Sequence, residues 1–357
     1  MEHIINKTLD PRNRKSKYDA MTVAKAEHLL RLTDAGLYCP AGDFYIDPGR
    51  PVERAVITHG HGDHARPNHG RVAATAETIA IMRVRFGEQA GAHLQSLRYN
   101  EPVTIGSVRV RLAPAGHVLG SAQVVVEHEG CRVVVSGDYK RRPDPTCPPF
   151  EPVPCDLFVT EATFALPVFR HPPDGTQVAK LRDSLVLFGE RAHAVGTYPL
   201  GKCQRMLRLL RRAGYDRPIY MHGALRALCD LYERFGIDFG ELRPVAGVAK
   251  KELAGEIVLA PPSALHDRWA RRLPDPLVAV ASGWMAIRQR AKQRRVELPL
   301  VVSDHADWDE LTQTVMDVGA PSLWVTHGRE DALVHWARQR GVDAKPLYLT
   351  GREDDAE

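Results

Sequence analysis

Three things are scarce or absent in this 357-residue sequence. No stretch approaches the roughly eighteen apolar residues that a membrane-spanning helix needs, and the start, MEHIINKTLDPRNRKSK, lacks the apolar core of a signal peptide. The six cysteines form no Cys-x-x-Cys pair, which argues against a disulfide framework and against a cysteine-ligated structural zinc. We therefore expect a cytoplasmic protein with free thiols and no membrane partner.

The charge of the chain is unevenly distributed. The formal net charge is +4, yet Val178 to Arg295 carries 22 Lys and Arg against 11 Asp and Glu, so this block has a net charge of +11 and the rest carries −7. Clustered positive charge attracts polyanions by releasing their condensed counterions. One such cluster alone would favour an ordinary solvated helix face, but two clusters in one block favour a nucleic-acid surface. The residues predicted to bind nucleic acid are Lys202, Arg205, Arg288, Arg290, Arg294 and Arg295.

The pattern of apolar residues divides the chain into three segments. Short Val- and Ile-rich stretches bounded by Gly, Pro or Asp, such as CRVVVSGD and DLFVTEA, predict a β-rich first segment over residues 1–174. From Gly175 to Arg295 longer helical and strand patterns alternate, which predicts a mostly parallel sheet covered by helices. Residues 296–357 return to the strand-dominated pattern. We expect a β-rich domain built from both ends of the chain, with an α/β domain inserted at 175–295.

The strongest chemical signal is the stretch THGHGDHARP, which follows the strand-like ERAVI. His59 and His61 alternate on one side of an extended segment, and Asp63 and His64 follow in the turn beyond it. Imidazole is a neutral ligand suited to zinc, and an added carboxylate suits a site of higher positive charge. Four potential ligands within six residues therefore predict a hydrolytic metal centre rather than a surface accident.

This stretch resembles the His-x-His-x-Asp-His motif of the metallo-β-lactamase superfamily. Later elements follow in the same order: His117 in APAGHVLGSAQ and Asp138 in VVVSGDY, while Asp47 precedes them in YIDPG. The resemblance implies that His117 and Asp138 join the ligands of a first metal, that Asp138 bridges to a second, and that Asp47 orients ligand imidazoles through hydrogen bonds. The metal ligands that it implies are His59, His61, Asp63, His64, His117, Asp138 and His327.

Three further motifs resemble those of the β-CASP nucleases within this superfamily. VTEATF supplies Glu161, SDHADWDE supplies His305 and WVTHGRED supplies His327. The resemblance implies an α/β protein, namely a metallo-β-lactamase αββα sandwich with an inserted β-CASP α/β domain. The stretch LYCPAGDFYIDPGRPVERAVITHGHGDHARP is also similar to bacterial ligase-associated DNA exonucleases, which implies a role in DNA repair and an association with a DNA ligase or helicase.

The implied chemistry is hydrolysis of a phosphodiester bond with two divalent metal ions, zinc by preference and manganese as the alternative. In this scheme Asp63 is a ligand that also orients the attacking water or accepts its proton. His305, supported by Glu161, donates a proton to the leaving oxygen.

Several other functions share part of this pattern. An RNA-processing nuclease would use the same chemistry and is the main alternative to a DNA exonuclease. A small-molecule metallohydrolase would share the first motifs but would not require Glu161, His305 and the basic block together. An inert nucleic-acid-binding scaffold would be expected to lack metal ligands, whereas every expected ligand position is filled here.

Overall fold

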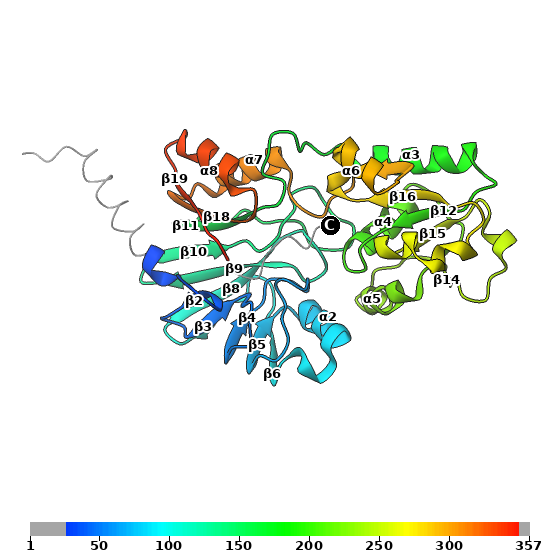
Figure 1. Cartoon of the computed structure of the whole chain (residues 1–357). Helices are drawn as coiled ribbons and strands as arrows, with labels where there is room; N and C mark the ends of the chain where they lie inside the picture. The colour runs from blue at the N-terminus through cyan, green and yellow to red at the C-terminus, as the bar shows by residue number, and fades with distance from the viewer. Residues whose placement is uncertain (1–25, 350–357) are drawn as a thin grey trace, which may run out of the picture.

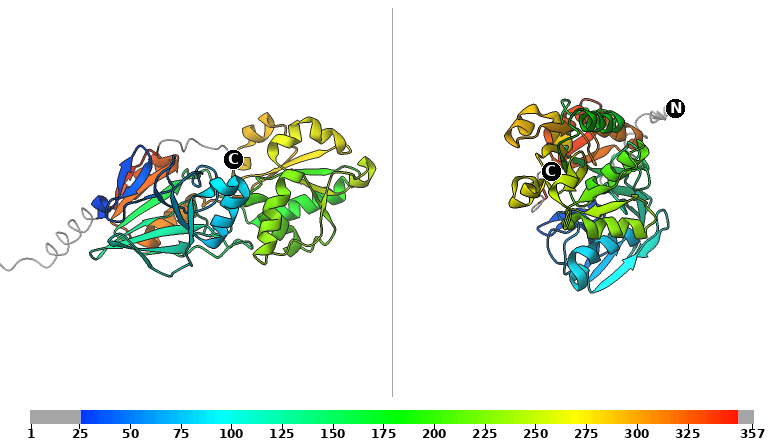
Figure 2. Two further views of the ribbon diagram at one scale, coloured as in Figure 1. Left: turned by 90° about the horizontal axis from the view of Figure 1, so that it is seen from below. Right: turned by 90° about the vertical axis from the view of Figure 1, so that its right-hand side faces the viewer.

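The computed structural model describes residues 26–349. Residues 1–25 and 350–357, which belong to the predicted first and third segments, lie outside the described residues. The described chain forms two lobes that lie side by side (Figure 1, Figure 2). The first lobe contains two sheets made from both ends of the chain, and the second lobe contains a third sheet made from residues 193–300.

Two mixed sheets form the first lobe. The first sheet has the strand order β1-β2-β3-β4-β5-β6, and the second has the order β19-β18-β11-β10-β9-β8-β7. The strands of the first sheet are β1 (Arg31–Thr33), β2 (Gly36–Cys39), β3 (Phe44–Ile46), β4 (Arg54–Val56), β5 (Arg71–Ala74) and β6 (His93–Ser96). Those of the second are β7 (Val103–Ile105), β8 (Val108–Pro114), β9 (Ala122–His128), β10 (Cys131–Val135), β11 (Leu157–Ala162), β18 (Ser322–Gly328) and β19 (Asp343–Pro346).

The apolar residues of these strands explain the layered packing. In β8 the buried Val108, Val110 and Leu112 alternate with two arginines, because successive side chains of a strand point to opposite faces. These three residues join Val56 and other apolar residues of the first sheet in one core between the two sheets. Helix α2 (Ala76–Phe86) covers the outer face of the first sheet, and helices α7 (Trp308–Val318) and α8 (Glu330–Arg338) cover that of the second. The expected αββα sandwich is confirmed.

The third sheet forms the core of the second lobe and is parallel throughout. Its strand order is β14-β13-β15-β12-β16-β17. Its strands are β12 (His193–Gly196), β13 (Ile219–Met221), β14 (Leu242–Pro244), β15 (Ile257–Ala260), β16 (Leu277–Ala281) and β17 (Leu298–Leu300). Helices α3 (Asp174–Leu187), α4 (Lys202–Arg212) and α5 (Gly223–Arg234) cover one face, and α6 (Arg288–Gln293) lies on the other. The predicted α/β character of this segment is confirmed.

One predicted boundary is wrong. Strand β17 pairs with β16, so the third sheet extends beyond the limit expected at Arg295. The segment LPLVV reads like the strands of the first lobe, but only its first three residues form a strand, and that strand is the edge of the third sheet. Pro299 lacks a backbone donor and is tolerated at such an edge.

The two lobes share part of one apolar core. Ile81 of α2 and Leu119 from the loop after β8 pack in the same cluster as Leu207 of α4 and Leu228 of α5. This contact holds the second lobe beside the strand ends of the first. None of the helices in residues 26–349 is long and apolar enough to cross a membrane.

Candidate metal centre

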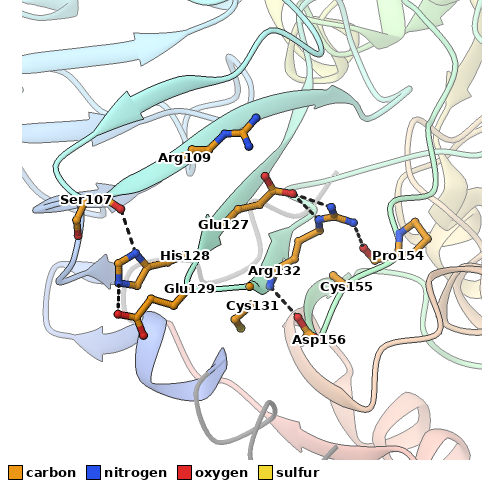
Figure 3. A pocket seen from close by; sticks show the side chains of 11 residues that line it. Ser107, Arg109, Glu127, His128, Glu129, Cys131, Arg132, Pro154, Cys155 and Asp156 are labelled. Atoms are coloured by element: carbon orange, nitrogen blue, oxygen red, sulfur yellow. Dashed lines mark hydrogen bonds and ion pairs between the residues drawn. The ribbon is translucent and has the colours of Figure 1, made fainter. Parts of the chain in front are cut away.

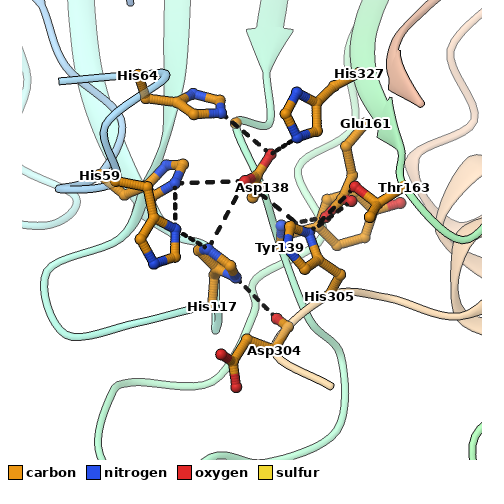
Figure 4. A network of polar contacts seen from close by, with 12 residues as sticks. His59, His64, His117, Asp138, Tyr139, Glu161, Thr163, Asp304, His305 and His327 are labelled. Atoms are coloured by element: carbon orange, nitrogen blue, oxygen red, sulfur yellow. Dashed lines mark hydrogen bonds and ion pairs between the residues drawn. The ribbon is translucent and has the colours of Figure 1, made fainter. Parts of the chain in front are cut away.

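The strand ends of the first lobe bring the predicted ligands together. Strands β10, β11 and β18 are parallel neighbours, so their carboxyl ends meet at one edge of the sheet. Asp138 follows β10, and Glu161 and His327 are the penultimate residues of β11 and β18. The loop after β4 carries the His59 to His64 motif to the same edge. Residues far apart in the sequence thus meet in one buried site (Figure 4).

The first group of ligand atoms surrounds a single point. His61 Nδ1 lies 3.1 Å from His59 Nε2 and 3.0 Å from His117 Nε2. Asp138 Oδ2 lies 3.4 Å from His59 Nε2 and 3.8 Å from His117 Nε2. Bonds of about 2.0–2.1 Å to a tetrahedral zinc place its ligand atoms about 3.3 Å apart. These separations therefore fit one zinc ion held by three imidazoles and one carboxylate.

The second group uses the other oxygen of the same aspartate. Asp138 Oδ1 lies 3.4 Å from His64 Nε2 and 4.0 Å from His327 Nε2. Asp63 Oδ2 lies 3.3 Å and 3.7 Å from the same two nitrogens. His327 reaches this position with a backbone φ of 59°, which is uncommon for a residue other than glycine and is often found at functional sites. Asp138 thus belongs to both groups.

The chemistry of the donors fits metal ions. Asp138 Oδ1 is buried and has no hydrogen-bond partner in the described part of the chain, a costly arrangement unless a cation faces it. Burial lowers the pKa of His59 to about 3 and also lowers the pKa of His61, so both rings are neutral at physiological pH and offer a lone pair. Burial alone would raise the pKa of Asp63, but the neighbouring His64 lowers it below its usual range and keeps the carboxylate ionised.

Asp47 and Thr58 orient two of the imidazoles. Asp47 Oδ2 lies 2.7 Å from His64 Nδ1 and accepts a hydrogen bond of 2.5 Å from the Thr58 hydroxyl. The hydroxyl in turn lies 3.1 Å from His59 Nδ1. Partners of this kind fix which ring nitrogen carries the proton and so leave Nε2 of both rings to face the metal. The sequence indicated Asp47 for this position but gave no sign of Thr58.

Two other imidazoles are held by backbone carbonyls. His61 Nε2 lies 3.3 Å from the carbonyl oxygen of Leu200, in the loop that precedes α4 of the second lobe. His117 Nδ1 lies 2.9 Å from the carbonyl oxygen of Asp304. Each ring therefore donates away from the metal and offers its other nitrogen to it. The second lobe thus contributes directly to the geometry of the first metal group.

Glu161 and His305 form a pair beside the metal ligands. Glu161 Oε2 lies 2.9 Å from His305 Nδ1, and Glu161 Oε1 accepts a hydrogen bond of 2.8 Å from the backbone N–H of Tyr139. Both side chains are buried, and His305 Nδ1 lies 4.0 Å from Asp138 Oδ2. The carboxylate therefore fixes the orientation of the imidazole next to both metal groups (Figure 4).

A cavity of about 280 Å³ opens onto this centre. One side consists of metal-group side chains, among them Asp63 and His327, together with His305, and the other side comes from the second lobe. Arg85 of α2 also lines it. No sequence pattern indicates Arg85, because a single arginine in an exposed turn of a helix resembles any surface residue.

The second lobe places Lys202 and Arg205 where they cannot meet a substrate. Both side chains are completely buried. Lys202 Nζ lies 3.0 Å from Asp304 Oδ2, and Arg205 pairs with Asp144 at 2.9 Å and with Asp174. Their assignment to nucleic-acid binding is therefore wrong. They instead hold the segment that carries Asp304, whose carbonyl orients His117.

The four remaining arginines lie at or near the surface around α6. Arg288 and Arg295 are exposed, while Arg290 and Arg294 are partly buried. The guanidinium of Arg290 lies 3.9 Å from the ring centre of Trp284. Trp284 contacts Phe164, whose ring lies 6.2 Å from that of His305. Arg290 thus lies against an aromatic cluster that adjoins the metal centre, and the other three arginines belong to the same short segment.

A larger cavity, about 680 Å³, lies at the end of the second sheet that is opposite to the metal centre (Figure 3). Its lining includes Arg109, Glu127, Arg132 and Asp156, and Glu127 pairs with Arg132 at 2.7 Å. The groups that could hold a metal within residues 26–349 all contain Asp138, and none borders this cavity. The smaller cavity is therefore the better candidate for the active site.

The sequence profile of the metallo-beta-lactamase superfamily matches residues 30–217 of this chain. This match covers the metal motif and more than half of the sequence, so the chain belongs to the metallo-β-lactamase superfamily. The two buried groups described above fit a metal site of this fold. The crystal structure of a protein of unknown function from Enterococcus faecalis V583 has a similar fold, with a TM-score of 0.52, 16% identity, and coverage of 76% of this chain and 74% of that one.

Three curated relatives are informative. A protein named Probable DNA ligase, from Opitutus terrae, is 28% identical over 87% of this chain and 30% of its own length. Ribonuclease TTHA0252 from Thermus thermophilus is 33% identical over 34% of each chain. Endoribonuclease ysh-1 from Neurospora crassa is 29% identical over 50% of this chain and 26% of its own length. This chain thus spans about a third or less of the length of each of these relatives.

Proposed function

We propose that this chain is a two-metal phosphodiesterase that degrades DNA from an end. The observation that carries the proposal is the pair of ligand groups that share Asp138, since two adjacent metals are the usual device for in-line displacement at phosphate. The ligands of the first metal are His59, His61, His117 and Asp138, and those of the second are Asp63, His64, Asp138 and His327. Zinc suits this donor set, with manganese as the alternative.

The residues around the cavity have separate tasks in this reaction. Two divalent ions, when bound, supply Lewis acidity, which lowers the pKa of a water and neutralises charge that develops on the phosphate. Asp63 borders the cavity and orients the attacking water or accepts its proton. His305 also borders the cavity, Glu161 holds its Nδ1, and we assign it as the donor of a proton to the leaving oxygen.

The choice of a nucleic-acid substrate rests on charge and on relatives. The arginines around α6 provide positive charge beyond the aromatic cluster that adjoins the centre, and such groups contact phosphates flanking a scissile bond. DNA is favoured because the similarity to the protein named Probable DNA ligase extends over 87% of this chain, both lobes included. The name of that relative also supports a working association with a DNA ligase. A role in DNA repair and an association with a helicase rest on the family resemblance alone.

RNA processing is the second candidate. Ribonuclease TTHA0252 is 33% identical to this chain over the matched stretch, a higher identity over a shorter match than that of the ligase relative. The metal groups do not distinguish the two substrates, because selection between RNA and DNA depends on contacts to the 2′-hydroxyl rather than on the metals.

A degradation assay with three end-labelled substrates of matched sequence tests the proposal. Single-stranded DNA, duplex DNA and single-stranded RNA would be incubated with the purified protein and with its Asp138→Asn variant. We expect stepwise shortening of DNA from one end, fastest for the single strand because one strand fits the cavity, and no shortening by the variant. Degradation of RNA at least tenfold faster than DNA would replace the assignment with the RNA-processing one.

A further inference from the structure

Arg85 occupies an unusual position for a helix-surface arginine. It belongs to the last turn of α2, and its guanidinium donates a hydrogen bond to the carbonyl of Gly60, inside the loop of metal ligands. A Cβ atom on Gly62 would lie 2.9 Å from Arg85 Nη2, so the absence of a side chain at residue 62 leaves room for the guanidinium against this loop. Arg85 also lines the cavity together with His61 and Asp63.

The facing wall of the cavity has a different character. Tyr198, Pro199 and Leu200, from the loop before α4, line it together with Leu228 of α5. These residues present an aromatic ring and apolar groups, and such surfaces accept the π-face of any base. The lining therefore combines metal ligands, a cation from the first lobe and an apolar wall from the second lobe.

The size of the cavity limits what it can hold. Its volume of about 280 Å³ lies just below the range of roughly 300–1,000 Å³ that is typical of pockets for whole small ligands. A unit of about one nucleotide matches this volume, whereas a base pair with both strands does not. The lining is also matched to such a unit, since a nucleotide has a negative phosphate at one side and an apolar base face at the other.

We infer that the cavity is a subsite for one unpaired nucleotide next to the scissile phosphate, with Arg85 binding the neighbouring phosphate and the Tyr198 to Leu200 loop packing against the base. The inference rests on the proposed function and specifies its substrate as an unpaired strand end. Arginine suits this task because its guanidinium can donate to a phosphate while another of its N–H groups remains bonded to Gly60.

Kinetics with two kinds of substrate test the assignment of Arg85. Bis(p-nitrophenyl) phosphate has the scissile diester but no neighbouring phosphate, whereas a single-stranded oligothymidylate has both. For Arg85→Gln we expect KM for the oligonucleotide to rise about tenfold or more, the usual size of a lost charge-assisted hydrogen bond. Hydrolysis of the small diester should stay within about twofold of the wild type. Arg83→Gln, on the same helix but outside the cavity lining, is the matched control and should leave both substrates unchanged.

The outcomes separate three situations. An equal loss on both substrates would show that Arg85 acts only by supporting the metal loop, and an unchanged KM for the oligonucleotide would show that it does not reach the phosphate; either result overturns the subsite. If the wild type hydrolyses the small diester but no oligonucleotide, the proposed function itself fails.

The apolar wall has its own test. An oligonucleotide that is abasic at the terminal nucleotide keeps every phosphate but loses the base. With the wild-type protein we expect its KM to rise at least fivefold, in line with a lost stacking contact. An unchanged KM for the abasic strand would overturn the assignment of the wall to the base.

Discussion

Helices α4 and α6 of the second lobe have similar arginine-rich sequences but lie in different environments. In α4, Arg205 is completely buried between aspartates, and Arg211 donates to four backbone carbonyls. In α6 and the residues that follow it, Arg288 and Arg295 are exposed to solvent. The two environments differ because Asp144 and other carboxylates that are distant in the sequence fold against α4 and pair with its arginine. A run of positive charge therefore indicates a binding surface only where no buried carboxylate already pairs with it.

The buried pair should dominate stability. Replacing Arg205 by Met leaves the buried Asp144 without its counter-charge, and breaking such a pair by removing one partner typically costs about 3–5 kcal/mol. Urea unfolding would measure the change in the free energy of unfolding. Arg288→Gln, an exposed arginine of the same lobe, should change it by no more than about 0.5 kcal/mol. A loss below about 1 kcal/mol for Arg205→Met would mean that the buried arginine of α4 does not stabilise the fold more than the exposed arginine of α6.

His305 lies next to the buried ion pairs of α4, but its proposed role is in catalysis rather than in stability. It follows Asp304, which Lys202 holds in place, and we propose that it donates the proton to the leaving oxygen. His305→Ala should lower kcat on the order of a hundredfold, the usual size of a general-acid contribution. Metal analysis should still find close to two equivalents of zinc or manganese per chain, as in the wild type. A rate within tenfold of the wild type would remove His305 from the mechanism.

The arginines around α6 should affect nucleic-acid binding alone. Their replacement should have the smallest effect of the three predicted changes. Replacing Arg288, Arg290, Arg294 and Arg295 by Gln should weaken binding to single-stranded DNA and reduce its salt dependence. Each phosphate contact that is lost removes about 0.7 from the slope of log affinity against log salt. The value of kcat at saturating substrate should be unchanged. Titrations at several salt concentrations would measure the slope.

A control with the same change in charge strengthens this test. Lys250, Lys251, Arg271 and Arg272 are also exposed in the second lobe but lie outside α6. Their replacement by Gln should leave the slope almost unchanged. Equal effects of the two quadruple variants would show that overall charge, rather than the α6 region, attracts the nucleic acid.

The part of the site that is contiguous in sequence was the easiest to predict. His59, His61, Asp63 and His64 lie within six residues, and a strand followed by a turn brings them together without help from the rest of the fold. His117 and Asp138 were predicted only through resemblance to a family, since an isolated Gly-His or Gly-Asp is usually just a turn. The structure explains why that resemblance holds, because separate strands end at the same edge of one sheet.

Other features could not be predicted because they depend on tertiary contacts. Nothing local distinguishes Arg85 from Arg83, and only the packing of α2 beside the metal loop places one of them at the cavity. Lys202 can be buried because Asp304, about a hundred residues away in the sequence, pairs with it. Strand β17 belongs to the third sheet because it pairs with the edge of β16. The division into a β-rich part and an inserted α/β part, by contrast, follows from apolar periodicity, which is a local property. The αββα sandwich itself is implied only by the family resemblance.

The bond between His61 and the carbonyl of Leu200 joins a metal ligand of one lobe to the backbone of the other. Metal affinity and the docking of the lobes are therefore thermodynamically linked, and the coupling free energy is the same in both directions. Whatever strengthens the docking of the lobes would tighten the binding of an ion, and binding of an ion would stabilise the docked arrangement by the same free energy. A metal ion bound at the first group would thus also stabilise the arrangement of the two lobes.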